Sequence, residues 1–111
     1  MIKILQHYQD NEYFAEIIEN DKILAKCTYD FVNNEILDII EIESCGMMLE
    51  SLIKSVLNKF DLCNKKIIIC KNMKLKILLE KLGFLYENEL FKIDLNGYFE
   101  KSCSENPKNQ V

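Results

Sequence analysis

The sequence predicts a single α/β domain with a mixed sheet of about six strands and two main helices. Three observations predict this class. Apolar and polar residues alternate along most of residues 2–42, which is typical of strands. Apolar residues then recur with helical spacing after Gly46 and again after Asn72. The length of 111 residues fits one domain, so we expect a domain over residues 1–98 and a polar tail over 99–111.

The first half of the chain predicts an antiparallel meander. Its four expected strands span residues 2–8, 12–19, 22–31 and 35–42. Turn-forming residues separate them at 9–11, 20–21 and 32–34. In the third strand, Leu24 is expected on the face opposite the one shared by Ile23, Ala25, Cys27, Tyr29 and Phe31.

The second half alternates helices with strands. The apolar positions from Met48 to Phe60 predict one amphipathic helix. Residues 66–70 form an apolar run typical of a strand that is covered on both faces and pairs in parallel. A second helix is expected from Asn72, a good N-cap, to Gly83, and a last strand from 91 to 95.

Composition and charge exclude several classes of partner. The 14 basic residues are all Lys, and 18 acidic residues give a net charge of −4, which argues against a nucleic-acid partner. No apolar run approaches the roughly 20 residues of a membrane span, and the first residues do not resemble a secretory leader, so we expect a cytoplasmic protein.

The cysteines and the single histidine predict neither disulfides nor a metal site. The five Cys are an odd number without a CxxC pair, and Cys27, Cys63 and Cys70 have apolar neighbours, where a thiol behaves as a small apolar side chain. These residues and His7 also lack any recurring ligand spacing, so no metal is expected.

Two segments carry a family resemblance. The segment Asn72 to Phe84 resembles the closing motif of the GNAT superfamily of acyl-CoA-dependent N-acetyltransferases, and its Glu80-Lys81-Leu82-Gly83-Phe84 ending matches that motif residue for residue. Gly46-Met47-Met48-Leu49 resembles the end of the family's pyrophosphate loop as it enters a helix. The order of the expected elements is also that of the family, and the resemblance covers residues 22–95.

The resemblance implies acetyl transfer from acetyl-CoA to a small-molecule or peptide amine by direct attack. It also implies that the fourth and fifth strands splay apart to admit the pantetheine arm. A Gly-containing turn at a helix N-terminus presents backbone N–H groups that suit a pyrophosphate. The positions that the resemblance assigns to cofactor binding are Ile40, Ile42, Ser44, Cys45, Gly46, Met47 and Asn72.

For catalysis, the amine must be neutral when it attacks the thioester, which calls for a general base. We rank Glu41 first and Glu43 second for this role, since the fourth strand borders the reaction site in the family. Both residues also have a plain interpretation as solvated carboxylates. Leu79 occupies the position where much of the family has a proton-donating Tyr, and it cannot donate a proton.

Other departures from the family keep a second function open. Only Gly46 of the family's usual loop pattern is kept. Glu41 and Glu43 place negative charge beside the expected anion site. Residues 9–11 leave no room for the helices that shape the acceptor groove in the family. The alternative is a GNAT-like domain without catalysis that binds a CoA-type ligand or a protein. A homodimer through an edge strand or a helix face is a further expectation.

Three minor alternatives also remain at this stage. Cys45 beside a helix N-terminus is either a nucleophile with His7 as its base or an ordinary turn residue. Asn72 is either a cofactor contact or a plain N-cap. The lysines of the second helix either meet the cofactor 3′-phosphate or form a solvated face; they are Lys74, Lys76 and Lys81.

Overall fold

The meander forms as predicted in the computed structural model, which describes residues 1–99. Its strands are β1 (Ile2–Gln9), β2 (Glu12–Glu19), β3 (Lys22–Asp30) and β4 (Glu35–Glu41), each antiparallel to the next. The turns at Asp10-Asn11 and Asn20-Asp21 have positive φ at both residues, the geometry of a two-residue type I′ hairpin. Asn and Asp tolerate that geometry better than most residues, which is why the chain turns there.

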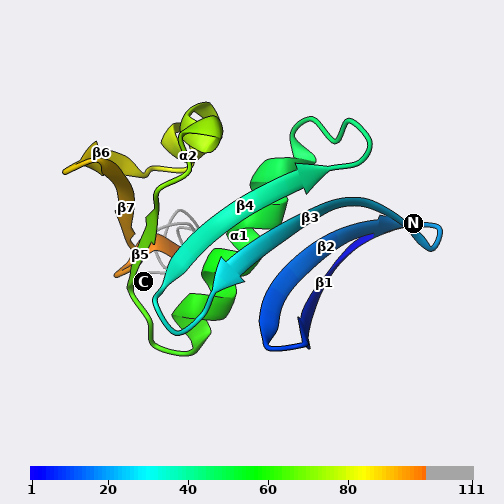
Figure 1. The fold of residues 1–111 in the computed structure, drawn as a ribbon, viewed down its shortest axis with the longest axis horizontal. Helices are drawn as coiled ribbons and strands as arrows, with labels where there is room; N and C mark the ends of the chain where they lie inside the picture. Colours follow the sequence, from blue (N-terminus) through cyan, green and yellow to red (C-terminus); the bar gives the residue numbers. More distant parts are fainter. Residues whose placement is uncertain (100–111) are drawn as a thin grey trace, which may run out of the picture.

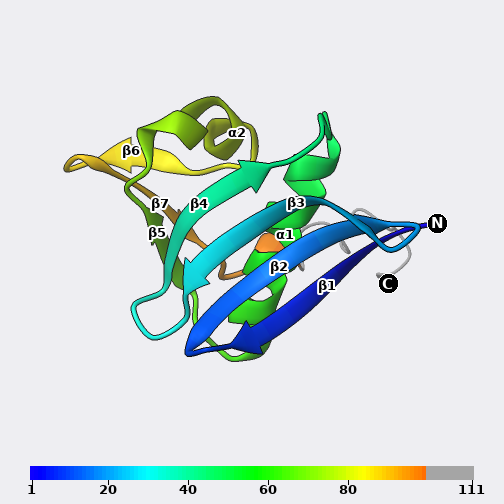
Figure 2. The same cartoon turned by 45° about the vertical axis from the view of Figure 1, so that its right-hand side comes forward.

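The remaining elements complete a mixed seven-stranded sheet in the order β1-β2-β3-β4-β5-β7-β6. They are α1 (Met48–Leu62), β5 (Ile67–Cys70), the 3₁₀ turn η1 (Met73–Leu75), α2 (Lys76–Lys81), β6 (Leu85–Glu87) and β7 (Leu90–Asp94). In Figure 1, α1 runs behind the sheet, and Figure 2 places α2 beyond the end of β5, between β6 and the end of β4. The α/β class, the two helices and the parallel contact of the fourth and fifth strands are confirmed.

The sheet has one strand more than the sequence predicted. β6 pairs with β7 through a hairpin whose turn residues, Asn88 and Glu89, have positive φ. The segment is only three residues long and all three are exposed, so it shows no apolar alternation that would mark a strand.

The second helix is shorter than predicted, because the predicted N-cap, Asn72, caps the preceding turn η1 and α2 itself starts after Leu75. Asn72 caps η1 by accepting a hydrogen bond from the Lys74 N–H at 3.0 Å. At the other end, Gly83 adopts a φ of +103° and its N–H bonds to the Glu80 carbonyl, while the Phe84 N–H bonds to the Leu79 carbonyl. This pair of bonds is a Schellman motif, in which glycine provides the left-handed conformation.

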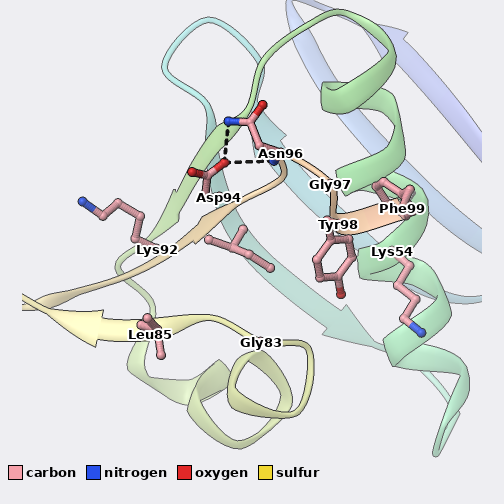
Figure 3. Close-up of a pocket in the computed structure, with 10 residues that line it drawn as sticks. Lys54, Gly83, Leu85, Lys92, Asp94, Asn96, Gly97, Tyr98 and Phe99 are labelled. Atoms are coloured by element: carbon pink, nitrogen blue, oxygen red, sulfur yellow. Dashed lines mark hydrogen bonds between the residues drawn. The ribbon is translucent and has the colours of Figure 1, made fainter. Parts of the chain in front are cut away.

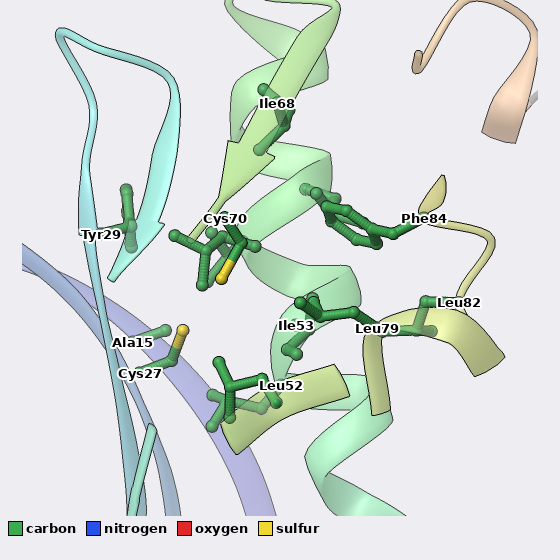
Figure 4. Packing of buried hydrophobic residues seen from close by; sticks show 14 of the residues in the cluster. Ala15, Cys27, Tyr29, Leu52, Ile53, Ile68, Cys70, Leu79, Leu82 and Phe84 are labelled. Atoms are coloured by element: carbon green, nitrogen blue, oxygen red, sulfur yellow. The ribbon is translucent and has the colours of Figure 1, made fainter. Parts of the chain in front are cut away.

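The core lies between α1 and one face of the sheet. Figure 4 shows side chains of β2 and β3 facing Leu52 and Ile53 of α1, with Leu79 and Phe84 closing one side. The opposite face of the sheet keeps exposed apolar side chains, which include Leu5, Ile40 and Ile67. Burial in β5 therefore alternates, and the prediction that this strand is covered on both faces was wrong.

A β-bulge changes the predicted faces of the third strand. Ile17 pairs with Ala25 and Ile18 pairs with Ile23, so Leu24 is an extra residue in β3. As a result, Leu24 is 5% exposed and joins the core, whereas Ile23 is 38% exposed. Strict alternation placed these two residues on the wrong faces, because it cannot detect an inserted residue.

Within residues 1–99, no helix is both long and apolar enough to cross a membrane. The predicted tail lies outside the described residues from position 100 onward, while Phe99 packs partly buried against the core. In the same described range, no group of three His, Cys, Asp or Glu side chains is arranged to hold a metal ion.

The cysteines differ sharply in exposure, which gives a test of the packing. Cys27 and Cys70 are buried, and burial raises the pKa of Cys27 to about 12, while Cys63 is exposed, contrary to prediction. In a Cys103→Ser background, we expect one thiol to react rapidly with Ellman's reagent in the native protein, and Cys63→Ser to remove that fast phase. A fast phase that persists in Cys63→Ser would contradict the burial of the other thiols.

Candidate functional site

The sheet splits between β4 and β5. The two strands pair at only two positions, Glu35 with Ile69 and Ile36 with Cys70, and then diverge. A second bulge starts the divergence: Tyr29 pairs with Ile36 and Thr28 with Asp38, so Leu37 is an extra residue in β4. Figures 1 and 2 both show β4 continuing away from β5 toward α1.

A cavity of about 360 Å³ lies beside the split. Three elements line it: the end of β4, the first turn of α1, and the η1–α2 segment. Its apolar walls come mostly from Ile39, Leu49, Leu75, Ile77 and Leu78. Its charged groups are balanced, with the carboxylates of Asp38 and Glu41 set against the ammonium groups of Lys74 and Lys81.

The backbone of β4 presents an unpaired edge to this cavity. The Ile42 N–H bonds to the Leu24 carbonyl of β3, at 2.8 Å. Because neighbouring residues of a strand point their N–H and C=O groups to opposite sides, those of Ile39 and Glu41 face the split. The Ile39 N–H is satisfied by the Asp38 carboxylate at 2.8 Å. An extended ligand lying in the split would find the Ile39 carbonyl and the Glu41 N–H within reach of an added strand.

Asn72 spans the split at its closed end. Its Nδ2 donates to the Leu37 carbonyl at 3.1 Å and to the Asp38 carboxylate at 2.9 Å, while its Oδ1 caps η1. One side chain thus fastens the bulge of β4 to the turn that follows β5. Asn72 therefore acts as an N-cap and a positioning residue, with all its amide groups used inside the protein.

We expect Asn72→Ala to destabilise the fold by about 1–2 kcal/mol, because it removes a cap and two hydrogen bonds to β4. Urea unfolding followed by circular dichroism measures this loss. Asn72→Asp is the matched control, since it keeps the cap acceptor but places a second carboxylate next to Asp38. A stability of Asn72→Ala equal to that of the wild type would mean that these contacts do not hold the split.

Several backbone N–H groups of the loop between β4 and α1 and of the helix start bond to acceptors in the same segment. The Glu41 carboxylate accepts a hydrogen bond from the Cys45 N–H at 2.7 Å. The first N–H groups of the helix bond to carbonyls three residues back, namely Met48 to Cys45, Leu49 to Gly46 and Glu50 to Met47, at 3.1–3.2 Å. Gly46 turns the chain with a φ of +56°. Few of the N–H groups that a helix start usually offers to an anion remain free.

Solved structures show where this architecture occurs. A mutant form of the spermidine/spermine N-acetyltransferase SpeG from Vibrio cholerae superposes with a TM-score of 0.62 at 19% identity, over 85% of this chain and 74% of that chain. A SpeG chimera of V. cholerae and hSSAT also gives 0.62, at 16% identity over 84% and 71%. An N-acetyltransferase from Staphylococcus aureus Mu50 gives 0.58, at 14% identity over 78% and 69%.

The chain has the GNAT fold. No protein-family model matches its sequence, and no curated protein does either. The resemblance predicted from the Glu80 to Phe84 ending and from the order of elements is therefore confirmed at the level of the fold.

The split fits one part of the ligand that GNAT proteins use, and the loop does not fit the other. An extended pantetheine arm matches the open edge of β4 and the apolar, charge-balanced cavity. The resemblance would place the diphosphate of CoA on the β4–α1 loop, where Glu41 already occupies the Cys45 N–H and Glu43 pairs with Lys22. An anion there would meet two carboxylates and few free donors.

The two predicted bases lie near the start of this loop. Glu41 lines the cavity, whereas Glu43 pairs with Lys22 and does not line it. Their roles as bases stay predictions. Leu79, at the position where the resemblance places a Tyr, is fully buried in the core.

None of the predicted cofactor contacts lines the cavity. The side chains of Ile40, Ile42 and Met47 are exposed, by 54%, 61% and 80%, and none of them lines the cavity. Ser44 is exposed in the loop, and Cys45 is buried with its thiol donating to the Glu43 carbonyl at 3.1 Å. The structure instead brings Asp38, Ile39, Leu49, Ile77 and Leu78 to the cavity, and the sequence analysis named none of them as site residues.

The alternative of a Cys45 nucleophile with His7 as its base is wrong. His7 lies on β1, which β2 and β3 separate from β4, and its Nε2 is 3.0 Å from the Glu16 carboxylate. Burial, Glu41 and Glu43 all raise the pKa of the Cys45 thiol. A nucleophilic cysteine requires the opposite shift.

A larger cavity, of about 580 Å³, lies between β7 and α1 (Figure 3). Three of its polar side chains, those of Asp94, Asn96 and Tyr98, make hydrogen bonds within the fold. The Asp94 carboxylate accepts both hydrogen bonds that Asn96 offers, at 2.8 and 2.9 Å, and the Tyr98 hydroxyl donates to the Leu82 carbonyl at 2.8 Å. This cavity contains none of the predicted site residues, so the split is the stronger candidate site.

Proposed function

We propose that the domain binds an acyl thioester through its pantetheine arm in the split and transfers the acyl group to an amine. The observation that carries this proposal is the split itself: β4 leaves β5 after two residue pairs and presents an open edge to a cavity. The GNAT fold supports the choice of thioester, because N-acetyltransferases of known structure share this architecture.

The groups of the site suit such an arm. The amides of the pantetheine arm would pair with the Ile39 carbonyl and the Glu41 N–H, as a strand added to β4. Its methylene groups would lie against Leu49 and Leu78. The two lysines and two carboxylates around the cavity leave little net charge, which favours an uncharged segment of the ligand over an anionic one.

In the transfer step, Glu41 would take a proton from the attacking ammonium, directly or through water. The amine nitrogen then forms a bond to the thioester carbonyl carbon and gives its next proton to water, and the carbon–sulfur bond breaks. The thiolate leaves and takes a proton from water, since the buried Leu79 offers none. Because two of the similar structures are spermidine acetyltransferases, spermidine is the first amine to test.

A second candidate function is binding without catalysis. The observation that favours it is Leu79, whose apolar side chain is buried at the position where the family resemblance places a proton donor. In that case the domain would hold the ligand, and release of free thiol with spermidine present would not exceed the rate without protein.

The test is thermal unfolding with S-acetyl pantetheine and, separately, acetyl-CoA. A ligand at about 100 times its Kd should add about 2.7 kcal/mol of stability and raise the midpoint by roughly 10 °C. Leu78→Trp, which fills the cavity, should abolish the shift, while Leu62→Trp on the exposed side of α1 should retain it. The absence of a shift with both thioesters would refute the proposal.

A further inference from the structure

Resting on that proposed function, we propose that the acyl donor is a thioester of pantetheine that lacks the nucleotide diphosphate. The donor would enter the split by its arm alone, and its far end would meet a loop that repels phosphate. The class of ligand is thus an acyl-pantetheine group with little or no negative charge, in place of acyl-CoA.

The loop already holds a carboxylate of its own, that of Glu41. The Glu41 carboxylate lies 2.7 Å from the Cys45 N–H, as a phosphate oxygen would. A bound diphosphate would have to displace this carboxylate and leave it facing the phosphate. The first three N–H groups of α1, those of Met48, Leu49 and Glu50, already have carbonyl partners, which leaves the N–H groups of Gly46 and Met47 as donors in the turn.

The charge around the loop also opposes a diphosphate. The segment from Glu41 to Glu50 contains three glutamates and no lysine. Two lysines pair with its glutamates, Lys22 with Glu43 and Lys81 with Glu50 at 4.0 Å. Of the three glutamates, Glu41 is the one without a lysine partner among the described residues. A diphosphate would therefore be bound against repulsion, with no free cation on the loop to offset it.

The pantetheine arm itself meets no such obstacle. The open edge of β4 and the apolar walls of the cavity offer uncharged groups, and the Lys74 ammonium lies 3.7 Å from the Asp38 carboxylate. An uncharged ligand can use these groups without breaking any contact of the loop. The cavity thus favours the pantetheine arm, whereas the β4–α1 loop opposes the nucleotide diphosphate of CoA.

The experiment compares three thioesters by isothermal titration calorimetry at 50 mM and 300 mM NaCl. They are S-acetyl pantetheine, S-acetyl 4′-phosphopantetheine and acetyl-CoA, in order of increasing negative charge. At 50 mM NaCl, we expect Kd to rise in that order, with acetyl-CoA about fivefold or more weaker than S-acetyl pantetheine. At 300 mM NaCl the difference should narrow, because salt screens the repulsion.

The double variant Glu41→Gln/Glu43→Gln should lower the Kd of acetyl-CoA about fivefold or more relative to the Kd of S-acetyl pantetheine. The amide introduced by Glu41→Gln retains an oxygen for the Cys45 N–H, so the loop should keep its shape. The matched control, Glu12→Gln/Glu87→Gln, removes two exposed carboxylates that line neither the cavity nor the loop.

The outcomes separate this inference from the proposed function. If the wild type binds acetyl-CoA more tightly than S-acetyl pantetheine, the inference is wrong and thioester binding stands. If none of the three thioesters binds, both are wrong. An unchanged acetyl-CoA affinity in the double variant would also overturn the inference, because the carboxylates would then have no effect on the diphosphate.

Discussion

A Phe60→Ala variant is expected to lose about 3–5 kcal/mol of its free energy of unfolding. Phe60 is fully buried on α1, and its ring lies 5.4 Å, centroid to centroid, from the rings of both Tyr29 and Phe31. Removing the ring leaves a cavity where the helix, β3 and the turn after β3 meet. For a small domain whose total stability is about 5–15 kcal/mol, such a loss is a large fraction.

Urea unfolding followed by far-ultraviolet circular dichroism measures this change. Leu62→Ala is the control, since Leu62 lies on the same helix but is 77% exposed, and we expect its effect to stay within about 0.5 kcal/mol. A loss below about 1 kcal/mol in Phe60→Ala would mean that the aromatic cluster does not anchor the helix to the sheet.

The second large effect is expected at Glu41. If Glu41 is the general base, Glu41→Gln should lower turnover with S-acetyl pantetheine and spermidine by about 10²–10⁴-fold. The amide is nearly the same size and can still accept the Cys45 hydrogen bond, so the loop geometry is preserved. The measurement is the initial rate of thiol release at saturating thioester.

Glu43→Gln separates the two predicted bases. Glu43 pairs with Lys22 and does not line the cavity, so its substitution should change turnover by less than tenfold, a smaller factor than general-base catalysis supplies. Calorimetry on both variants distinguishes a loss of catalysis from a loss of binding. Turnover of Glu41→Gln equal to that of the wild type would remove Glu41 from the mechanism.

The parts of the fold that depend on local chemistry could be predicted from the sequence. Asn20-Asp21 turns the chain because both residues tolerate positive φ, and Gly83 ends α2 for the same reason. The apolar stripe from Leu52 to Phe60 faces the core as its spacing requires. These signals act over a few residues, so a single sequence carries them.

The parts that depend on a neighbouring strand could not be predicted. The bulges at Leu24 and Leu37 each insert one residue, and the bulge at Leu24 exchanges the faces expected for Ile23 and Leu24. Nothing in the residue types marks the insertion, because it is defined by the register with the partner strand. β6 was missed for a related reason: it is a strand only because β7 supplies its partner.

The candidate site was predicted in place but not in detail. The resemblance placed the split between the correct strands, and Gly46 lies in the loop as expected. The bulge at Leu37 helps to explain why Ile39, rather than Ile40, reaches the cavity. The sequence also placed Glu41 near an anion site, but only the structure reveals that its carboxylate bonds to the Cys45 N–H.

The break in the sheet has a consequence for how the molecule opens. With only two residue pairs joining β4 to β5, the β-ladder does little to couple the meander to the β5–β7 half. Coupling rests mainly on α1 and the side chains packed beneath it. Amide hydrogen exchange should therefore resolve two sets of protection factors, with β1–β4 exchanging as one unit and β5–β7 as another. A ligand that lies between β4 and β5 would merge the two sets of protection factors, since its hydrogen bonds would replace the missing pairs between these strands.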